Sequence, residues 1–348
     1  MGACCSAQYD DVADPAKQPV VVADIRSVAK TMLEQRSSGE KMKGGAAADL
    51  NLITPEIKAA SSRHSTGGPS SCASGWGESS EDDGCTTFAS LSINSETGIV
   101  SPEEFKKVIS TKPSNFLTEV TVFSHNLQWW SLFGFKNGNK GSATRLLRAT
   151  LPDIAGWQEC EDVSRILGTQ GDSLFSGQVN AGLLADYRGI QGRFSLAFAY
   201  KFTDWDVIAD GFEEVATDEE EQFSGPRGVI WARFRHRRSS KVVFAINHFG
   251  PMRVNSGGKA GGATTAGKIA TVIYRCAQPG DGVVLFGTFN SQAQSRTVRH
   301  LERYLFKVWT GSVYGGIDHV FSSLPVDHAQ NLSKGGSDHE AVAITFLL

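Results

Sequence analysis

Residues 283–291, with the sequence VVLFGTFNS, constrain the fold of this chain more than any other segment. Four consecutive apolar residues predict a buried β-strand, and Gly287 ends it with a residue that tolerates unusual backbone angles. Polar residues follow at once: Thr288, Asn290 and Ser291. Buried strands that deliver polar side chains at their carboxyl ends build the reaction centres of α/β proteins. The segment therefore predicts an α/β domain with a polar site at one sheet edge.

Several other segments also end a predicted strand with polar side chains. In chain order they are SHNLQ (124–128), GWQECED (156–162), INHFG (246–250), IDHVFSS (317–323) and SDHEAVAITF (337–346). Together with VVLFGTFNS, this ordered set resembles the endonuclease/exonuclease/phosphatase family, which has the fold of deoxyribonuclease I. The resemblance covers residues 117–348.

The resemblance implies both a fold and an activity. The expected fold is a four-layer αββα sandwich of the α/β (α+β) class, in which helices flank two packed mixed β-sheets. The expected activity is hydrolysis of a phosphodiester or phosphomonoester by metal-assisted attack of water, with Mg²⁺ (or Mn²⁺) as cofactor. The phosphate-ester substrate is a lipid, an inositol phosphate or a nucleic acid.

The resemblance also assigns roles to individual residues. The implied metal ligands are Glu159, Asn126 and Asp338; the implied catalytic residues are His339, Asp318, His248 and Asn290; the implied substrate contacts are Arg227 and Thr288. Asp318 is expected to orient the His339 imidazole and raise its basicity. From the residues alone, a strand-end asparagine is more often a turn former and a lone histidine is more often structural.

One position departs from the family pattern. Where the family has Gly-Asp-Phe-Asn, this chain has Gly287, Thr288, Phe289 and Asn290. Threonine cannot carry negative charge or accept the proton of water, and loss of a general base costs about 100- to 10,000-fold in rate. Two functions therefore stay open: a hydrolase that uses His339 as its base, and a catalytically impaired, membrane-tethered phosphate-binding module.

Periodicity predicts the helices of this domain. SATRLLRAT (142–150) is amphipathic, and a further helix ends near Cys276. SRTVRHLERYLFKVW (295–309) has apolar residues at helical spacing up to Val308, which predicts one long helix with a core-facing side.

Charge and composition narrow the choice of partners. The formal net charge is −3, which argues against binding nucleic acid through bulk electrostatics. The basic run RFRHRR (233–238) predicts either a solvated strand end or a local patch, and the patch keeps a nuclease among the alternatives. Six cysteines without a CxxC pair favour a reducing compartment.

The N-terminal third differs from the rest of the chain. Residues 1–87 are rich in Ala, Ser, Gly and charged residues, which predicts a disordered tail. Residues 88–115 predict a short helical linker that resembles a degenerate EF-hand, because Ile93 occupies the position of the first calcium ligand. Ser101-Pro102-Glu103-Glu104 begins a capped helix with or without a metal.

The first six residues, MGACCS, fit the pattern for N-myristoylation at Gly2, and Cys4 and Cys5 are adjacent palmitoylation candidates. A second lipid is needed because one acyl chain holds a protein only marginally on a membrane. We therefore expect the chain at the cytoplasmic face of a membrane, and we expect Gly2→Ala to move it into the soluble fraction after cell fractionation. An unchanged distribution would contradict the lipid anchor.

Overall fold

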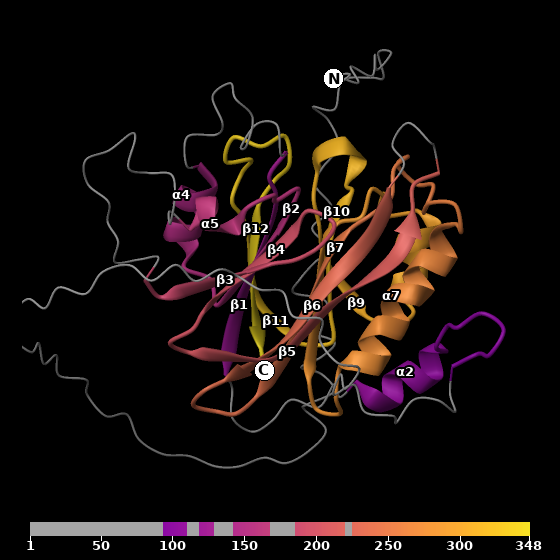
Figure 1. The fold of residues 1–348 in the computed structure, drawn as a ribbon, viewed down its shortest axis with the longest axis horizontal. Helices are drawn as coiled ribbons and strands as arrows, with labels where there is room; N and C mark the ends of the chain where they lie inside the picture. Colours follow the sequence, from indigo (N-terminus) through magenta and orange to yellow (C-terminus); the bar gives the residue numbers. More distant parts are fainter. Residues whose placement is uncertain (1–92, 110–117, 129–141, 168–184, 220–224) are drawn as a thin grey trace, which may run out of the picture.

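The computed structural model describes residues 93–109, 118–128, 142–167, 185–219 and 225–348. Their strands form two six-stranded mixed sheets that pack face to face (Figure 1). Sheet one has the order β11-β12-β1-β2-β4-β3, and sheet two has the order β5-β6-β7-β8-β10-β9. Each sheet contains one parallel pair, β1 with β2 and β7 with β8.

The bounds of the strands are as follows. Sheet one comprises β1 (Glu119–Asn126), β2 (Ile154–Gln158), β3 (Tyr187–Gln191), β4 (Leu196–Lys201), β11 (Val326–Asn331) and β12 (Val342–Leu347). Sheet two comprises β5 (Trp205–Thr217), β6 (Pro226–His236), β7 (Val242–Phe249), β8 (Gly282–Thr288), β9 (Phe306–Thr310) and β10 (Asp318–Ser322).

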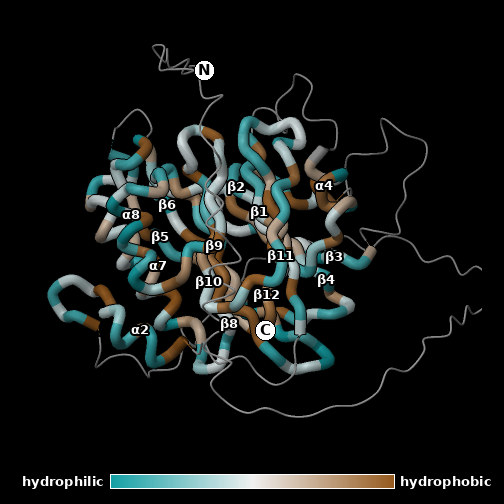
Figure 2. The backbone as a smooth tube through the Cα atoms, turned by 180° about the vertical axis from the view of Figure 1, so that it is seen from behind, coloured by the Kyte–Doolittle hydropathy of each residue, from teal (hydrophilic) through white to brown (hydrophobic). Residues whose placement is uncertain are grey.

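Helices cover the outer face of each sheet. On sheet one lie α4 (Ser142–Thr150) and α5 (Val163–Ile166); on sheet two lie α2 (Pro102–Val108), α7 (Gly262–Cys276) and α8 (Arg296–Leu301). Seen from behind, hydrophobic stretches recur along the strands (Figure 2). The described residues therefore form the four-layer αββα sandwich that the sequence predicted.

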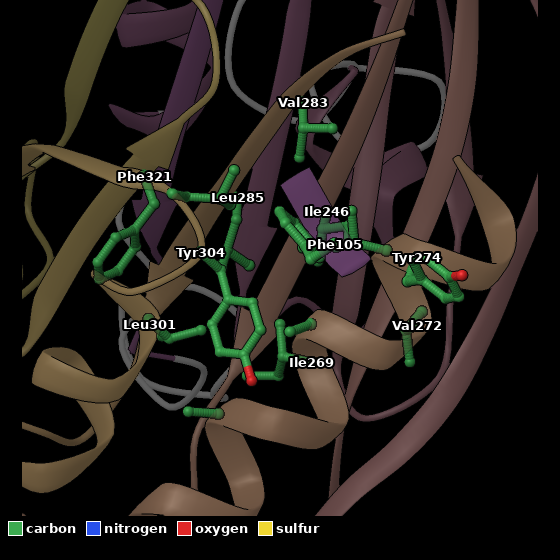
Figure 3. Close-up of a cluster of buried hydrophobic side chains, with 14 of the residues drawn as sticks. Phe105, Ile246, Ile269, Val272, Tyr274, Val283, Leu285, Leu301, Tyr304 and Phe321 are labelled. Carbon is green, nitrogen blue, oxygen red and sulfur yellow. The ribbon is translucent and has the colours of Figure 1, made fainter. Parts of the chain in front are cut away.

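Alternation along the strands divides the apolar side chains into separate cores. In β8, Val284 and Phe286 face the other sheet, whereas Val283 and Leu285 face the helices. The helix-side core of sheet two gathers residues from α2, α7, α8 and five strands, β5, β6, β7, β8 and β10 (Figure 3). The fully apolar run of β8 is explained by this double burial, because both of its faces are covered.

The segment that contains α2 belongs to this helix-side core. Ser101 caps the helix by accepting a hydrogen bond from the Glu104 N–H, which confirms the predicted capped helix. The Phe105 side chain is fully buried, and its ring contacts that of Tyr304 with centroids 5.2 Å apart. The Tyr304 hydroxyl donates to the Val100 carbonyl at 3.0 Å. The predicted linker therefore packs on the sandwich.

The long helix predicted over residues 295–309 is wrong in its second half. Helix α8 ends at Leu301, and residues Phe306–Thr310 form strand β9 instead. Strand β9 pairs with β10, where Trp309 lies opposite Val320. The aromatic and β-branched residues of this stretch suit a strand, and the tertiary pairing overrides the helical spacing of the apolar residues.

The predicted tail, residues 1–87, lies outside the described residues, as do Gly2, Cys4 and Cys5. Within the described ranges, no helix has the length and apolar character needed to cross a bilayer.

Three histidines are buried as neutral side chains. Burial lowers the pKa of His125, of His248 and of His319 to about 4. The rings of His248 and His319 lie edge-on to Phe289, with centroids 5.0 and 5.5 Å from it. These rings must gain a proton in an apolar environment when the pH falls, whereas they gain it freely in the unfolded chain.

We therefore expect the free energy of unfolding to fall as the pH is lowered from 6.5 to 4. In this window the unfolded chain binds more protons than the folded chain, so protonation favours the unfolded state. Each histidine is expected to lower the free energy of unfolding by up to roughly 3 kcal/mol between pH 6.5 and pH 4. Urea denaturation at stepped pH measures this. The His319→Asn variant is expected to be less stable than the parent by an amount that shrinks as the pH falls. A difference in the free energy of unfolding that stays constant with pH would contradict the burial of His319 as a neutral ring.

Candidate active site

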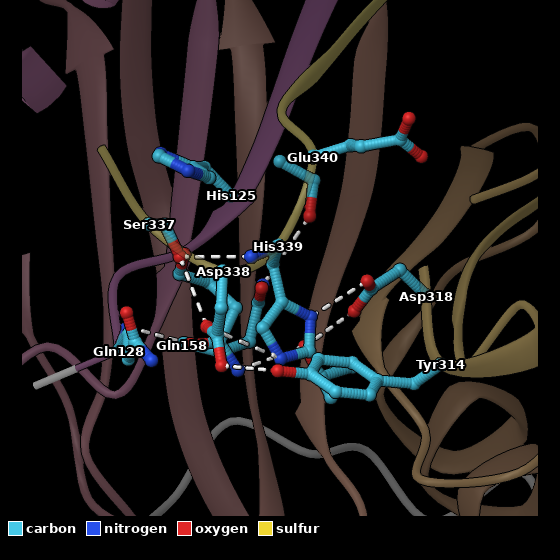
Figure 4. A network of polar contacts seen from close by, with 12 residues as sticks. His125, Gln128, Gln158, Tyr314, Asp318, Ser337, Asp338, His339 and Glu340 are labelled. Atoms are coloured by element: carbon cyan, nitrogen blue, oxygen red, sulfur yellow. Dashed lines mark hydrogen bonds and ion pairs between the residues drawn. The ribbon is translucent and has the colours of Figure 1, made fainter. Parts of the chain in front are cut away.

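The ends of four strands meet at one edge of the sandwich and carry the polar cluster (Figure 4). Strand β1 ends at Asn126, and Glu159 follows its parallel neighbour β2. Strand β8 of the facing sheet ends at Thr288, which pairs directly with Asp318 at the start of the antiparallel strand β10. His339 comes from the loop that precedes β12. The fold thus brings together side chains that are up to 213 positions apart, from Asn126 to His339.

A chain of hydrogen bonds crosses from sheet one to sheet two within this cluster. The Asn126 amide donates to Glu159 Oε1 and to Thr288 Oγ1, both at 3.1 Å. Thr288 Oγ1 in turn donates to Asp318 Oδ1 at 2.6 Å. Asn126 and Thr288 are each 1 % exposed, so these bonds form away from solvent.

Asp318 and His339 form a carboxylate–imidazole dyad. The Nδ1 atom of His339 lies 2.7 Å from Asp318 Oδ2, so the carboxylate accepts from both Thr288 and His339. Burial lowers the pKa of His339, but the hydrogen bond and charge of Asp318, together with Asp338 and Glu159, outweigh it and raise the pKa above its ordinary value. Because Nδ1 carries the proton shared with Asp318, Nε2 is the atom that faces the reaction.

Asp338 lies on the other side of the imidazole. Its Oδ1 atom is 3.9 Å from His339 Nε2, and its Oδ2 atom accepts a hydrogen bond of 2.6 Å from the Tyr314 hydroxyl. Ser337 fixes this loop, since its hydroxyl donates to the Asn126 carbonyl at 2.7 Å and accepts from the His339 N–H at 3.1 Å. Tyr314 was missed in the sequence because no spacing links residue 314 to residue 338.

Backbone strain marks the same edge of the sandwich. Gln128, Glu159 and Asn290, which follow β1, β2 and β8, have φ angles of 49°, 55° and 47°. Left-handed backbone is uncommon for residues other than glycine, and asparagine tolerates it better than glutamate or glutamine. Such conformations persist where the surroundings hold them and cluster at functional sites. The conformation of Glu159 therefore independently supports a functional role for this residue.

Two of the predicted site residues lie apart from the cluster. Asn247 faces the other sheet, so His248, the next residue of β7, faces the helix-side core. Its Nδ1 atom bonds the Gly228 carbonyl at 2.9 Å, while Nε2 is buried without a hydrogen-bond partner among the described residues. Arg227 is at the start of β6, where its Nε donates to both oxygens of the buried Asp218.

Asn290 lies just beyond Thr288 but turns toward β7. Its side-chain amide donates to the Gly250 carbonyl at 2.9 Å, and its backbone carbonyl accepts from the Asn255 N–H at 2.8 Å. In this structure Asn290 therefore joins the end of β8 to the loop after β7.

A second buried polar link between the sheets lies directly below the cluster. Gln158 donates to Asn247 Oδ1 at 2.7 Å, and the Asn247 amide donates to the Trp157 and Ala197 carbonyls at 2.8 and 3.1 Å. Both side chains are buried. This link fixes how the two sheets meet beneath the site. Its only signal in the sequence was a polar residue, Asn247, at a sheet-facing position of an apolar strand.

The residues at this edge suit a Mg²⁺ site in which the ion keeps most of its water ligands. The Asn126 oxygen accepts from the Gln128 N–H at 2.9 Å, so its amide group donates to Glu159 and supports that carboxylate. Among the described residues, no three His, Cys, Asp or Glu side chains form a cage that would hold a metal by themselves. Mg²⁺ is usually bound by one or two carboxylates plus water and substrate phosphate. Glu159 and Asp338, whose charges both act on His339, fit that mode.

The basic run at residues 233–238 lies at the opposite edge of sheet two. Arg227, at the start of β6, is on the same edge as the end of β8, whereas Arg235 pairs with Val242 at the start of β7. Arg233 is buried in a two-pronged ion pair with Asp281, and Arg237 pairs with Asp206 at 2.6 Å. The run therefore does not extend the cluster.

Comparison with known proteins was informative at the level of structure. No family model matches the sequence, and no curated protein does. The structure is similar to an endonuclease/exonuclease/phosphatase from Bacteroides vulgatus, with a TM-score of 0.52 and 15 % identity over 66 % of this chain and 98 % of that one. It is also similar to an endonuclease/exonuclease/phosphatase family protein from Bacteroides thetaiotaomicron, with a TM-score of 0.51 and 16 % identity over 67 % and 99 % of the two chains. The chain therefore has the fold of the endonuclease/exonuclease/phosphatase family.

Proposed function

We propose that this chain is a metal-dependent phosphoesterase that hydrolyses a phosphate ester by attack of water. The observation that carries the proposal is the dyad of Asp318 and His339, in which His339 Nδ1 lies 2.7 Å from Asp318 Oδ2. The charge of the Glu159 carboxylate acts on the same imidazole. A buried carboxylate that fixes the tautomer of an imidazole is a general-base arrangement. The fold supports the same reaction class by analogy.

In the proposed mechanism, Nε2 of His339 takes the proton of the attacking water while Nδ1 keeps its hydrogen bond to Asp318. The imidazolium that forms is stabilised by the charge of Asp318. Glu159, with Asp338, would hold the magnesium ion. A bound ion would supply positive charge against the negative charge that develops on the phosphate oxygens. Asn126 orients Glu159 by donating to its Oε1.

Thr288 contributes to this mechanism through its hydroxyl group. The hydroxyl donates to Asp318 and accepts from Asn126, so it satisfies two buried polar groups at once. An aspartate at this position would set a second carboxylate against Asp318, and two carboxylates this close do not both ionise readily without a cation. Thr288 is therefore proposed to hold the dyad in place.

The proposed substrates are small phosphate esters at the cytoplasmic face of a membrane, a class that includes lipid and inositol phosphates and small esters with an aromatic substituent. The support for the membrane is the sequence around Gly2, Cys4 and Cys5. A nuclease is the second candidate, and its support was the basic run at 233–238. Because that run lies at the far edge of sheet two and three of its arginines, Arg233, Arg235 and Arg237, are paired with carboxylates, the structure favours the small-molecule alternative.

We expect the chain to hydrolyse bis(p-nitrophenyl) phosphate with magnesium and to lose this activity with a chelator. His339→Asn and Glu159→Gln are each expected to lower kcat by about 100- to 10,000-fold, because they remove the base or the metal ligand. Release of p-nitrophenolate measures the rate, and plasmid DNA serves as a second substrate that tests the nuclease. Glu161→Gln removes an exposed carboxylate two residues away and is expected to match the parent.

A rate that survives the chelator would contradict the metal-dependent mechanism. A parent that turns over neither substrate but still binds inorganic phosphate would instead favour the phosphate-binding module.

The hydroxyl at position 288 gives a separate expectation. Thr288→Val keeps the shape of the side chain but removes one hydrogen-bond partner from the Asn126 amide and the Thr288 donor from Asp318 Oδ1. We expect kcat to fall about 10- to 100-fold because a hydrogen bond to a charged group is lost. Thr288→Ser keeps the hydroxyl and is expected to stay near the parent. The same chromogenic assay measures both. A Thr288→Asp variant faster than the parent would show that the chain lacks a base at this position.

A further inference from the structure

Tyr314 lies over the catalytic imidazole without belonging to any strand of the site (Figure 4). It is in the turn η4 (Val313–Gly315), between β9 and β10. The centroid of its ring is 5.4 Å from that of His339, and the two planes are inclined by 51°. The tyrosine is 49 % exposed, so the side chain borders both the site and solvent.

The backbone at Tyr314 is strained and held from two sides. Its φ and ψ angles are 51° and 29°, a left-handed conformation that is a clear outlier for an aromatic residue. On one side, Ser312 donates through its N–H and its hydroxyl to Glu340, the residue after His339, at 2.7 and 2.9 Å. On the other side, Gln292 contacts the Tyr314 carbonyl at 3.4 Å. Strained backbone conformations persist where surrounding contacts fix them, and they cluster at functional sites such as ligand clamps.

The hydroxyl group fixes the ring as well as the backbone does. It donates to Asp338 Oδ2 at 2.6 Å, and this charge-assisted bond ties Tyr314 to the loop that also carries His339. The aromatic ring is thus anchored at both ends while half of the side chain stays open to solvent. A pre-ordered ring loses little conformational entropy when a ligand covers it, and planar rings stack on tyrosine without needing specific hydrogen bonds.

We propose that Tyr314 is a specificity-determining residue that stacks on a planar ring carried by the substrate next to the reacting phosphate. The inference rests on the proposed phosphoesterase function, which places that phosphate beside Nε2 of His339. The substrate class is then a phosphate ester whose second substituent is a flat aromatic ring. This narrows the small phosphate esters of the proposed function to those with an aromatic substituent, because the alkyl and polyol groups of lipid and inositol phosphates present no π-face to Tyr314.

Two substrates with the same leaving group test the inference. Thymidine 5′-(p-nitrophenyl phosphate) and methyl p-nitrophenyl phosphate both release p-nitrophenolate when water adds to phosphorus, and they differ only in the group that is retained. We expect the parent to prefer the thymidine ester by about tenfold in kcat/KM, mainly through KM, and we expect this preference to disappear in Tyr314→Ala. Tyr314→Phe keeps the ring but loses its anchor and is expected to fall between them.

Phe212→Ala is the matched control, because it removes a 51 % exposed aromatic ring from strand β5 of sheet two. It is expected to keep the parent's preference. An unchanged preference in Tyr314→Ala, or a parent with no preference, would overturn the inference.

Failure of the proposed function is distinguishable from failure of this inference. If the parent hydrolyses neither ester, calorimetric binding of thymidine 5′-phosphate and of methyl phosphate replaces the kinetic measurement. Tighter binding of thymidine 5′-phosphate that is lost in Tyr314→Ala would support the stacking role in a chain without turnover. Equal binding of the two, or a preference that Tyr314→Ala retains, would overturn it.

Discussion

The hydrogen bond from Thr288 to Asp318 is the interaction on which the candidate site depends. It ends a chain of contacts that starts at Glu159 and passes through Asn126, and this chain joins sheet one to Asp318 of sheet two. Asp318 is only 6 % exposed, and a carboxylate at that depth needs its charge balanced by donors. The hydroxyl of Thr288 supplies one of these donors and His339 supplies the other.

This chain of contacts requires the two sheets to meet in one arrangement. The link between Gln158 and Asn247 sits just below it and fixes the separation of β2 and β7. A buried polar network of this kind stabilises a structure only when its members are paired, because an unpaired buried group costs its full desolvation. The polar link below and the hydrogen-bond chain of the candidate site above thus depend on the same packing of the sheets. The strain at Glu159 fits this arrangement, since the Asn126 amide of the neighbouring strand holds its carboxylate.

The alternation of side chains along the strands explains why neighbouring residues have different surroundings. Thr288 faces the other sheet, and Phe289 points into the helix-side core. His248 shares that core, in which its ring is neutral and its Nδ1 bonds a backbone carbonyl. The preceding residue, Asn247, instead faces the other sheet, where it bonds Gln158. The departure from the family pattern at Thr288 and the position of His248 thus concern opposite faces of sheet two.

The order of apolar strands and the polar residues at their ends predicted the α/β class, and they carried the family resemblance that implied the four layers and most of the cluster. These features are local, since burial of a strand follows from its own sequence and residue types indicate the chemistry they perform. Tertiary structure decided the rest. Pairing with β10 turned residues 306–310 into a strand, and strand alternation separated His248 from the dyad. The β9–β10 turn brought Tyr314 to Asp338. The physical reason is that register, strand partner and turn conformation depend on contacts between residues far apart in the chain, which no local pattern encodes.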